Sequence, residues 1–355
     1  EPVNPLDAWG TGHDFEGVIE DSMSYLCADP DTAIGAMFVE TRSGNSLHEG
    51  YARAMQNAIR KMQGATAGSA KPVIIVNNVA AVGSDELAVH LTNNGVPVLI
   101  GIDPALAVIK GAFDRRDRLK RPRMAPAAPP AGVKARWLQR LQAGGTLEEA
   151  ESLALMSDYG LPVLPHRVVE SAAAAQQAAG EIGWPVVVKT AAPGVFHKSD
   201  VGGVRLDLVN AAALDAAYRD MAARLGPRML VMKMAGKGVE LSFGSIDDAQ
   251  FGPLVMVGAG GVLIEMLSDR RFALPPIDAA EARRLLDGLA LRPLLDGKRG
   301  QPAADLGSVA TAFAAFSVMV GDLGGLIAEI DINPVLATPK GAIALDALVV
   351  PAKGK

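Results

Sequence analysis

The sequence predicts an α/β protein built from two parts, a domain with a parallel sheet and a second module of mixed helices and strands. Three features lead to this prediction. Within residues 1–120, short apolar runs that suit buried strands alternate with helical stretches. Residues 121–134 are typical of a surface linker. From residue 135 to residue 355 the pattern changes. We therefore expect domains at 1–120 and 135–355, joined by a linker at 121–134.

The first domain is predicted from three short apolar runs separated by helical stretches. The strand runs lie at residues 33–39, 72–76 and 96–100. The helical stretches lie at residues 47–62, between Ser84 and the Asn94-Gly95 pair, and at 104–113. Ser84 suits a helix N-cap, and an Asn-Gly pair suits a helix end. Alternation of this kind predicts a parallel sheet with helices on its faces.

The linker begins in a basic run. Six Arg and Lys residues lie between positions 115 and 123, and residues 125–130 are only Pro and Ala. The basic run suits a phosphate-bearing partner or a solvated linker, and we favour the linker.

The second module opens with a capping box. The string Thr-Leu-Glu-Glu at 146–149 predicts the start of a helix that ends at Gly160. Further helices are expected at 171–180, from Asn210 to Gly226, from a second capping box at 278–281, and at 306–320. Strands are expected at 163–164, 167–169, 185–189, 203–207, 229–234, 239–244, 254–257, 327–332 and 342–347.

Composition narrows the classes of function. The 355-residue chain has a net charge of −5, which disfavours a nucleic-acid or anionic-membrane partner. Cys27 is the single cysteine and the five histidines are scattered, so an internal disulfide is excluded and a Cys- or His-based zinc site is disfavoured. We find no apolar run of about 18–20 residues and no signal peptide, and we expect a cytoplasmic protein. The chain begins without Met, so we expect a fragment, a processed chain or a subunit, of open oligomeric state.

Lys189 is the first candidate site residue. It ends the strand run Pro-Val-Val-Val-Lys at 185–189 and precedes a loop that contains glycines. Burying an unpaired ammonium is costly, and a nucleotide phosphate would supply the missing negative charge. A lysine at a strand end can also extend its amine to water, so the local sequence leaves both interpretations open.

The loop after Lys189 holds the string His-Lys-Ser-Asp-Val-Gly-Gly at 197–203. Gly202 and Gly203 let backbone N–H groups approach a ligand closely. His197 can attack a phosphoryl group and carry it. A lone histidine is more often a structural hydrogen-bonding residue, so both readings of His197 stay open.

Two polar residues near the end of the chain suggest a metal site. Asn333 shares one strand face with Glu329 and Asp331, and Asp346 lies in the apolar run at 342–347. A carboxylate in such a run is costly unless it is paired or metal-bound, and Mg²⁺ prefers oxygen ligands. A solvated hairpin face is the alternative, and we favour the metal. The string Gly-Ala-Gly-Gly at 258–261 is a weaker signal, compatible with a phosphate-binding turn or a plain turn.

Taken together, these strings resemble a known family. The runs at 185–189, 196–204, 238–241, 250–253, 258–261, 299–300 and 331–334 are similar, in order and spacing, to the ATP-grasp module of ADP-forming acetate–CoA ligases, relatives of succinyl-CoA synthetase. The likeness covers residues 135–350. Residues 1–120 resemble, less specifically, the flavodoxin-like CoA-ligase domain of the same family. The resemblance implies a flavodoxin-like domain followed by an ATP-grasp domain of two α+β subdomains.

The resemblance also implies roles for single residues. Lys189 corresponds to the phosphate-binding lysine, and Asn333 and Asp346 correspond to the pair that holds the nucleotide Mg²⁺. Glu240 corresponds to the acidic residue of the nucleotide cleft. His197 corresponds to a histidine that carries phosphate towards the acyl site.

The adenine-contacting hinge is implied at residues 232–235, with Met234 as a nucleotide contact. The family often has Gln where this chain has Met232, which puts a side-chain contact to adenine there in doubt.

The implied activity is ATP-dependent ligation of a carboxylic acid to CoA, through phosphohistidine and an acyl phosphate. The family's CoA-binding domain and its second phosphorylatable histidine are not recognisable here, so this chain is expected to need them from the same polypeptide or a partner subunit. A nucleotide- or acyl-CoA-sensing module, for example one fused to an acyltransferase, is the alternative. A carboxylate–amine ligase is a weaker one, because the string at 197–203 argues against it.

Overall fold

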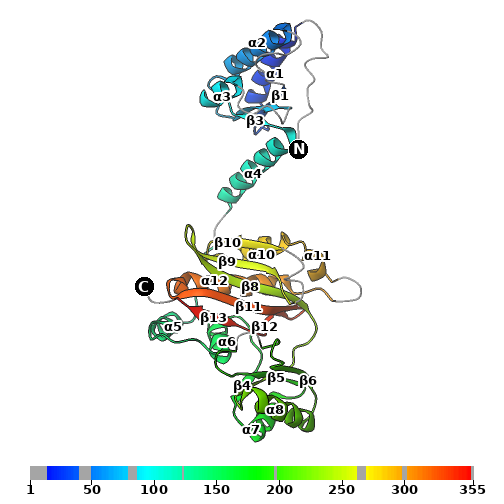
Figure 1. Ribbon diagram of the computed structural model, residues 1–355. Helices are drawn as coiled ribbons and strands as arrows, with labels where there is room; N and C mark the ends of the chain where they lie inside the picture. The colour runs from blue at the N-terminus through cyan, green and yellow to red at the C-terminus, as the bar shows by residue number, and fades with distance from the viewer. Residues whose placement is uncertain are drawn as a thin grey trace. The chain divides into compact units, whose positions relative to one another are not determined.

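The chain forms two compact units in a computed structural model, Glu1–Pro122 (unit 1) and Arg123–Lys355 (unit 2) (Figure 1). The structure describes residues 14–39, 49–78, 86–121, 124–195, 198–261, 269–297 and 302–352. Unit 1 holds a parallel sheet and unit 2 holds two antiparallel sheets, so the predicted α/β class is confirmed.

Unit 1 is built on a parallel sheet of order β1-β2-β3. Its strands are β1 (Gly35–Val39), β2 (Val73–Asn77) and β3 (Val98–Ile100). Its helices are α1 (Phe15–Ala28), α2 (Glu49–Thr66), α3 (Glu86–Asn93) and α4 (Ile102–Lys120). Because side chains alternate along a strand, Ile75 packs with α1, α2 and α3, while Ile74 and Val76 pack with Ala105 of α4 on the other face. The assignment of unit 1 as a CoA-ligase domain stays a prediction.

Helix α4 corrects one prediction. We expected a helix at 104–113 followed by a basic linker, but the helix continues to Lys120. Arg118 and Lys120 lie in its last turn, where cations are favoured by the helix dipole. The basic run therefore belongs mostly to a helix. Residues 124–130 form neither helix nor strand, and α5 (Val133–Gln142), which we did not predict, follows.

A four-stranded antiparallel sheet of order β4-β7-β5-β6 forms one lobe of unit 2 (Figure 1). Its strands are β4 (His166–Val169), β5 (Val186–Thr190), β6 (Val204–Leu208) and β7 (Met229–Lys233). Its helices are α7 (Ala172–Ile182) and α8 (Ala211–Leu225), which pack on one face against Val186 and Val188. Strand alternation places Lys189 on the opposite face of the sheet, which α7 and α8 do not cover.

A six-stranded antiparallel sheet forms the rest of unit 2, in the order β10-β9-β8-β11-β12 with β13 also paired to β11. Its strands are β8 (Val239–Asp248), β9 (Gly252–Ala259), β10 (Arg270–Ala273), β11 (Ile327–Thr338), β12 (Gly341–Ala344) and β13 (Leu348–Pro351). The accompanying helices are α6 (Glu149–Asp158), α10 (Ala279–Asp287), α11 (Arg292–Leu295) and α12 (Leu306–Leu323). We did not predict β10, α11 or β13.

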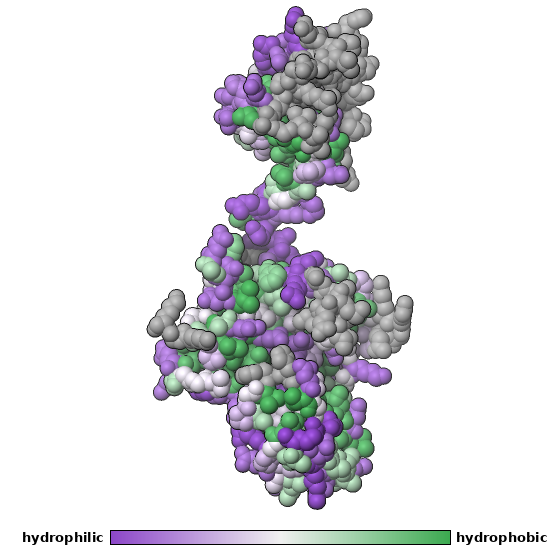
Figure 2. Space-filling view, in the orientation of Figure 1, coloured by the Kyte–Doolittle hydropathy of each residue, from purple (hydrophilic) through white to green (hydrophobic). Residues whose placement is uncertain are grey.

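Helix α12 is the central helix of the largest core. Phe313 and Phe316 are fully buried against Phe243 of β8, with ring centroids 4.9 and 6.0 Å from that of Phe243. Among the residues searched, Leu306–Leu326 is long and apolar enough to span a membrane, so our expectation that no run reaches that length was wrong. Of its apolar 18-residue window, 67% is buried within the protein, as expected of a core helix. On the viewed surface of unit 2, hydrophilic and hydrophobic residues are intermixed (Figure 2).

Candidate functional site

Four charged side chains of unit 2 meet between its two sheets. The amine of Lys189 lies 2.7 Å from Glu149 Oε1 and 3.2 Å from Asp346 Oδ2. The amine of Lys198 lies 3.1 Å from Glu149 Oε2 and 3.4 Å from Asp346 Oδ1. We call these four residues the charge cluster. It joins two cations and two anions from four separate segments of the chain.

The sequence around Lys189 explains why its amine is buried here. β5 is an inner strand, paired with β6 on one side and β7 on the other, and strand alternation turns Lys189 away from α7 and α8. The amine donates hydrogen bonds to Glu149 and, at 2.8 Å, to the backbone carbonyl of Leu345. Burial alone would lower the pKa of Lys189, but the carboxylates of Asp346 and Glu149 outweigh it and raise that pKa above its ordinary value.

Glu149 is a site residue that sequence analysis missed. We assigned it to a capping box that starts at Thr146, but α6 has Glu148 as N-cap, with no side-chain capping bond, and begins at Glu149. The carboxylate of Glu149 reaches the two amines of the charge cluster instead. The capping-box prediction was therefore wrong because a tertiary ion pair occupies the side chain that it needed.

Lys198 was also missed, although it lies inside the string that we singled out. The turn after it explains the two glycines. Gly202 has φ +61°, which favours glycine, and its N–H donates to Ser199 O at 3.0 Å. The Gly203 N–H donates to Lys198 O at 2.7 Å. We expected these N–H groups to face a nucleotide, but in this conformation both are used within the turn.

Asn333 and Asp346 lie next to the point where the pairing of β11 with β12 ends. β11 pairs with β12 from Val335↔Ala344, and the Leu345 N–H donates to Pro334 O at 3.1 Å. Continuing this register sets Asn333 opposite Asp346. Asp346 was expected within a strand but lies two residues after the end of β12. Asn333 lies at a β-bulge, since β11 gains one residue relative to β8 between Ile332 and Val335.

The oxygen atoms at this position suit a nucleotide-bound Mg²⁺. The Asp346 side chain is 30% exposed, and the Asn333 side chain is half-buried. Asn333 Oδ1 accepts a hydrogen bond from the Gly261 N–H at 3.0 Å, and an amide oxygen has a second lone pair for a metal. Among the described residues searched, no group of three His, Cys, Asp or Glu side chains could hold a metal. Two protein oxygens completed by phosphate and water fit the preference of Mg²⁺.

Glu240 and the turn after β9 lie beside Asn333. Glu240 is exposed on β8, and its carboxylate fills the space that a Cβ at Gly261 would need. The Gly260 N–H donates to Glu240 O at 3.0 Å. The glycines at 260 and 261 therefore permit close backbone approach, and Gly261 lies next to both the Glu240 carboxylate and the Asn333 amide.

The hinge predicted at residues 232–235 connects the two sheets of unit 2, since β7 ends at Lys233 and β8 begins at Val239. Met232 is 2% exposed, so its side chain belongs to the core. The Met234 N–H donates to Pro185 O at 3.0 Å, and the Met234 side chain is half-buried. His197, the predicted phosphate carrier, lies outside the described residues.

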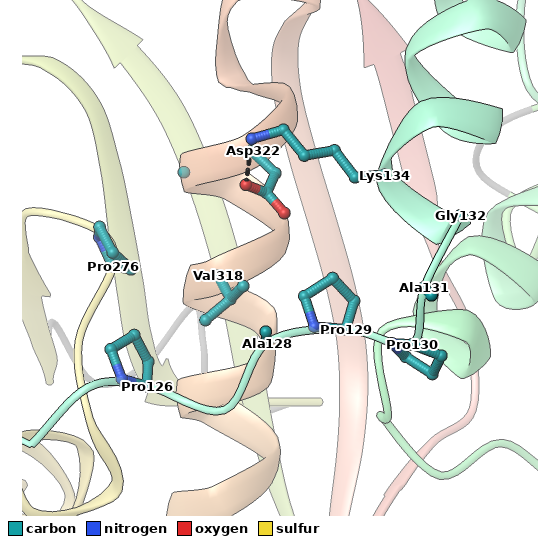
Figure 3. Close-up of a pocket in the computed structure, with 11 residues that line it drawn as sticks. Pro126, Ala128, Pro129, Pro130, Ala131, Gly132, Lys134, Pro276, Val318 and Asp322 are labelled. Atoms are coloured by element: carbon teal, nitrogen blue, oxygen red, sulfur yellow. Dashed lines mark hydrogen bonds and ion pairs between the residues drawn. The ribbon is translucent and has the colours of Figure 1, made fainter.

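One cavity of unit 2 lies away from the charge cluster. It has a volume of about 590 Å³ and is lined by the Pro/Ala stretch, Pro276 and α12 (Figure 3). An ion pair of 2.7 Å between Lys134 and Asp322 borders it (Figure 3). None of its lining residues belongs to the charge cluster, so the charges and oxygen ligands identify the candidate site better than this cavity does.

The charge cluster lies within a stretch of the chain that matches a known family. Residues 139–350 match the family model of the ATP-grasp domain. The β subunit of acetate–CoA ligase (ADP-forming) I from Pyrococcus furiosus is 35% identical over 215 residues, covering 58% of this chain and 91% of that subunit. Acetate–CoA ligase (ADP-forming) I from Archaeoglobus fulgidus is 36% identical over 214 residues. That match covers 58% of this chain but 31% of the relative, so the chain spans less than a third of that protein.

A solved structure supports the same likeness. Acetyl-coenzyme A synthetase 1 from Ca. Korarchaeum cryptofilum, in complex with coenzyme A and Mg-AMPPCP, gives a TM-score of 0.55 at 35% sequence identity. The match covers 62% of this chain and 100% of that one. In that structure a phosphohistidine segment points towards the nucleotide-binding site.

Proposed function

Because this chain belongs to the ATP-grasp family and is similar to β subunits of ADP-forming acetate–CoA ligases, we propose that it is the nucleotide-binding half of an acid–thiol ligase. The complete enzyme would convert a carboxylic acid, CoA and ATP into acyl-CoA, ADP and phosphate. The observation that best supports this proposal is the charge cluster, in which the amine of Lys189 lies 3.2 Å from Asp346, beside Asn333.

Mg-ATP is the nucleotide that we propose for this site, and CoA is a substrate of the complete enzyme. The Korarchaeum synthetase was solved with coenzyme A and Mg-AMPPCP, an analogue of Mg-ATP. In our proposal Asn333 and Asp346 hold the metal, and Lys189 binds phosphate. The metal, when bound, neutralises charge on the phosphate oxygens.

The protein's contribution to phosphoryl transfer is mainly position and charge. The reaction needs the triphosphate held in line with its acceptor and its negative charge balanced. A buried Lys189 amine does this better than an exposed one, because the surrounding dielectric is low. Glu240 and Met234 complete the proposed contacts to the nucleotide, and Gly202 and Gly203 shape the neighbouring turn.

We propose His197 as the acceptor of the phosphoryl group. A ring nitrogen would attack the γ-phosphorus, an N–P bond would form, and the bond to the β-phosphate oxygen would break to release ADP. The phosphoryl group would then pass to the acid, and the CoA thiol would displace phosphate from the acyl phosphate. His197 directly precedes Lys198, a member of the charge cluster.

We propose that the sites for the acid and CoA, and the second histidine, lie in another part of the enzyme, as domains of one polypeptide or as a partner subunit. This chain alone should therefore accept phosphate from ATP without completing the acyl transfer. A cytoplasmic location stays a prediction.

The test is transfer of labelled γ-phosphate from ATP to the purified chain. We expect label that is stable in base and labile in acid, lost in His197→Asn and in Lys189→Ala. His166→Asn is the matched control, because His166 lies on β4 with its ring nitrogen 2.8 Å from Leu164 O, and it should keep the label.

Two outcomes would change the proposal. ATP binding without any label would favour the nucleotide-sensing module. Full labelling of Lys189→Ala would refute the role of Lys189.

A further inference from the structure

Lys198 is a second cation at the candidate site, and it is buried almost as deeply as Lys189. The side chain of Lys198 is 11% exposed and that of Lys189 is 9% exposed. Both amines contact the same two carboxylates, Glu149 and Asp346. Buried amines with shared partners form a built site, unlike surface lysines that extend into water.

The turn between residues 198 and 203 explains how Lys198 reaches this place. Gly203 has no room for a side chain, because an added Cβ would lie 2.7 Å from Thr190 Cγ2 and 2.9 Å from the Lys198 carbonyl oxygen. The Thr190 N–H donates to Gly203 O at 2.8 Å, which fastens the turn to the end of β5. Since Lys189 precedes Thr190, the close approach at Gly203 brings the two lysines together.

The two carboxylates of the charge cluster differ in exposure. The Glu149 side chain is 6% exposed, whereas the Asp346 side chain is 30% exposed. A ligand from solvent therefore meets Asp346 more readily than Glu149, whose carboxylate is covered by the protein. A buried carboxylate that contacts both amines holds them in place within the site.

We propose that Lys198 is a second triphosphate-binding cation and that Glu149 is a positioning residue that holds Lys189 and Lys198 for the phosphates. The inference rests on the proposed nucleotide function of this site. Two amines suit the multiple charges of a triphosphate, and they have little to contribute to a monophosphate held by its base and sugar.

Nucleotide affinity measured by calorimetry tests the role of Lys198. The full chain is titrated with Mg-ATP, Mg-ADP and AMP. For Lys198→Met we expect Mg-ATP affinity to fall about tenfold, equal to about 1.4 kcal/mol, with AMP affinity unchanged. Lys198→Arg keeps the charge and should stay within about threefold of wild type. Lys340→Met is the matched control, since Lys340 is exposed at the turn between β11 and β12.

The outcomes separate this inference from the proposed function. Wild-type binding of Mg-ATP with an unchanged affinity in Lys198→Met would overturn only the role of Lys198. An equal loss of affinity for ATP and AMP, or an equal loss of ATP affinity in the Met and Arg variants, would show that Lys198 has a structural role. Either result would also overturn its role as a triphosphate-binding cation. A wild-type chain that binds no ATP would overturn both proposals.

The role of Glu149 is tested by a double-mutant cycle on the same affinities. If Glu149 acts by holding the amines, Lys198→Met should lower Mg-ATP affinity less in the Glu149→Gln background than in wild type. Additive losses would overturn the positioning role, because independent residues add. A loss of affinity for AMP in Glu149→Gln would show general disruption of the site and would overturn it as well.

Discussion

Replacing Lys189 by Met removes one of the two amines of the charge cluster and keeps most of the side-chain volume. The change leaves Glu149, whose side chain is 6% exposed, without its closest countercharge. It also removes the donor to the Leu345 carbonyl, which lies 2.8 Å from the amine. The folded state should therefore lose stability, because a buried carboxylate is held with too little positive charge.

The magnitude follows from what remains in the cluster. Breaking a buried ion pair by removing one partner costs about 3–5 kcal/mol. Lys198 still lies 3.1 Å from Glu149, so we expect the lower end, a loss of about 3 kcal/mol in the free energy of unfolding. Adding Glu149→Gln to Lys189→Met removes the uncompensated charge and should restore more than about half of that loss.

Urea unfolding near neutral pH, followed by tryptophan fluorescence, measures the effect. Trp137 and Trp184 report on unit 2, and Trp9→Phe silences the remaining tryptophan. Lys340→Met, at an exposed lysine, is the control and should leave the midpoint unchanged. A Lys189→Met chain as stable as wild type, or a double variant less stable than Lys189→Met, would refute the reasoning.

Three further predictions follow from single contacts. Gly203→Ala should lower both the melting temperature and the Mg-ATP affinity, because its Cβ has no room. Gly236→Ala is the control, since its Cβ would meet no atom within 4 Å. Equal melting temperatures for the two variants would contradict this prediction. Asp346→Asn should weaken Mg-ATP binding about tenfold and reduce the loss of ATP affinity on adding a chelator; an unchanged metal dependence in calorimetry would exclude Asp346 as a ligand. Asp305 is the N-cap of α12, and hydrogen bonds from the Ser308 side chain and backbone lower its pKa. This carboxylate therefore stabilises the fold at pH values above its unfolded pKa of about 3.9. The stabilisation is lost as the pH falls through the lower pKa of the folded state. The difference in urea midpoint between wild type and Asp305→Asn should therefore disappear in acid, and a difference independent of pH would count against it.

Much of the fold of unit 2 could be predicted because its signals are local. Ser171, Asn210 and Asp278 were read as helix starts, and each is an N-cap whose side chain accepts an N–H from three residues later. The apolar runs at β5 and β7 were also placed within a residue or so. A local pattern such as an N-cap predicts the folded structure correctly when no tertiary contact competes for the same side chain.

The capping box that begins at Thr146 failed for the opposite reason. Its pattern is as good locally as the others, but Glu149 pairs with Lys189, which is 40 residues away in sequence. No local pattern reports such a contact. The prediction of where α4 ends was wrong for a different reason, since a basic run before prolines suits both a helix end and a linker.

The candidate site was predicted in part. Lys189 and Asp346 were assigned to one nucleotide site, and their side chains do meet, at 3.2 Å. The countercharge of Lys189 was expected from phosphate alone, and the structure adds Glu149. Lys198 could have been suspected, because it lies within the conspicuous string at 197–203, but the direction of its side chain depends on the turn that Gly203 permits.

The most direct test of the account is a crystal structure of the chain with a non-hydrolysable ATP analogue and Mn²⁺ in place of Mg²⁺. We predict phosphate oxygens within hydrogen-bonding distance of the Lys189 amine. We also predict an anomalous metal peak about 2.1 Å from oxygens of Asn333 and Asp346. A nucleotide bound elsewhere, or a metal that contacts neither side chain, would contradict the account.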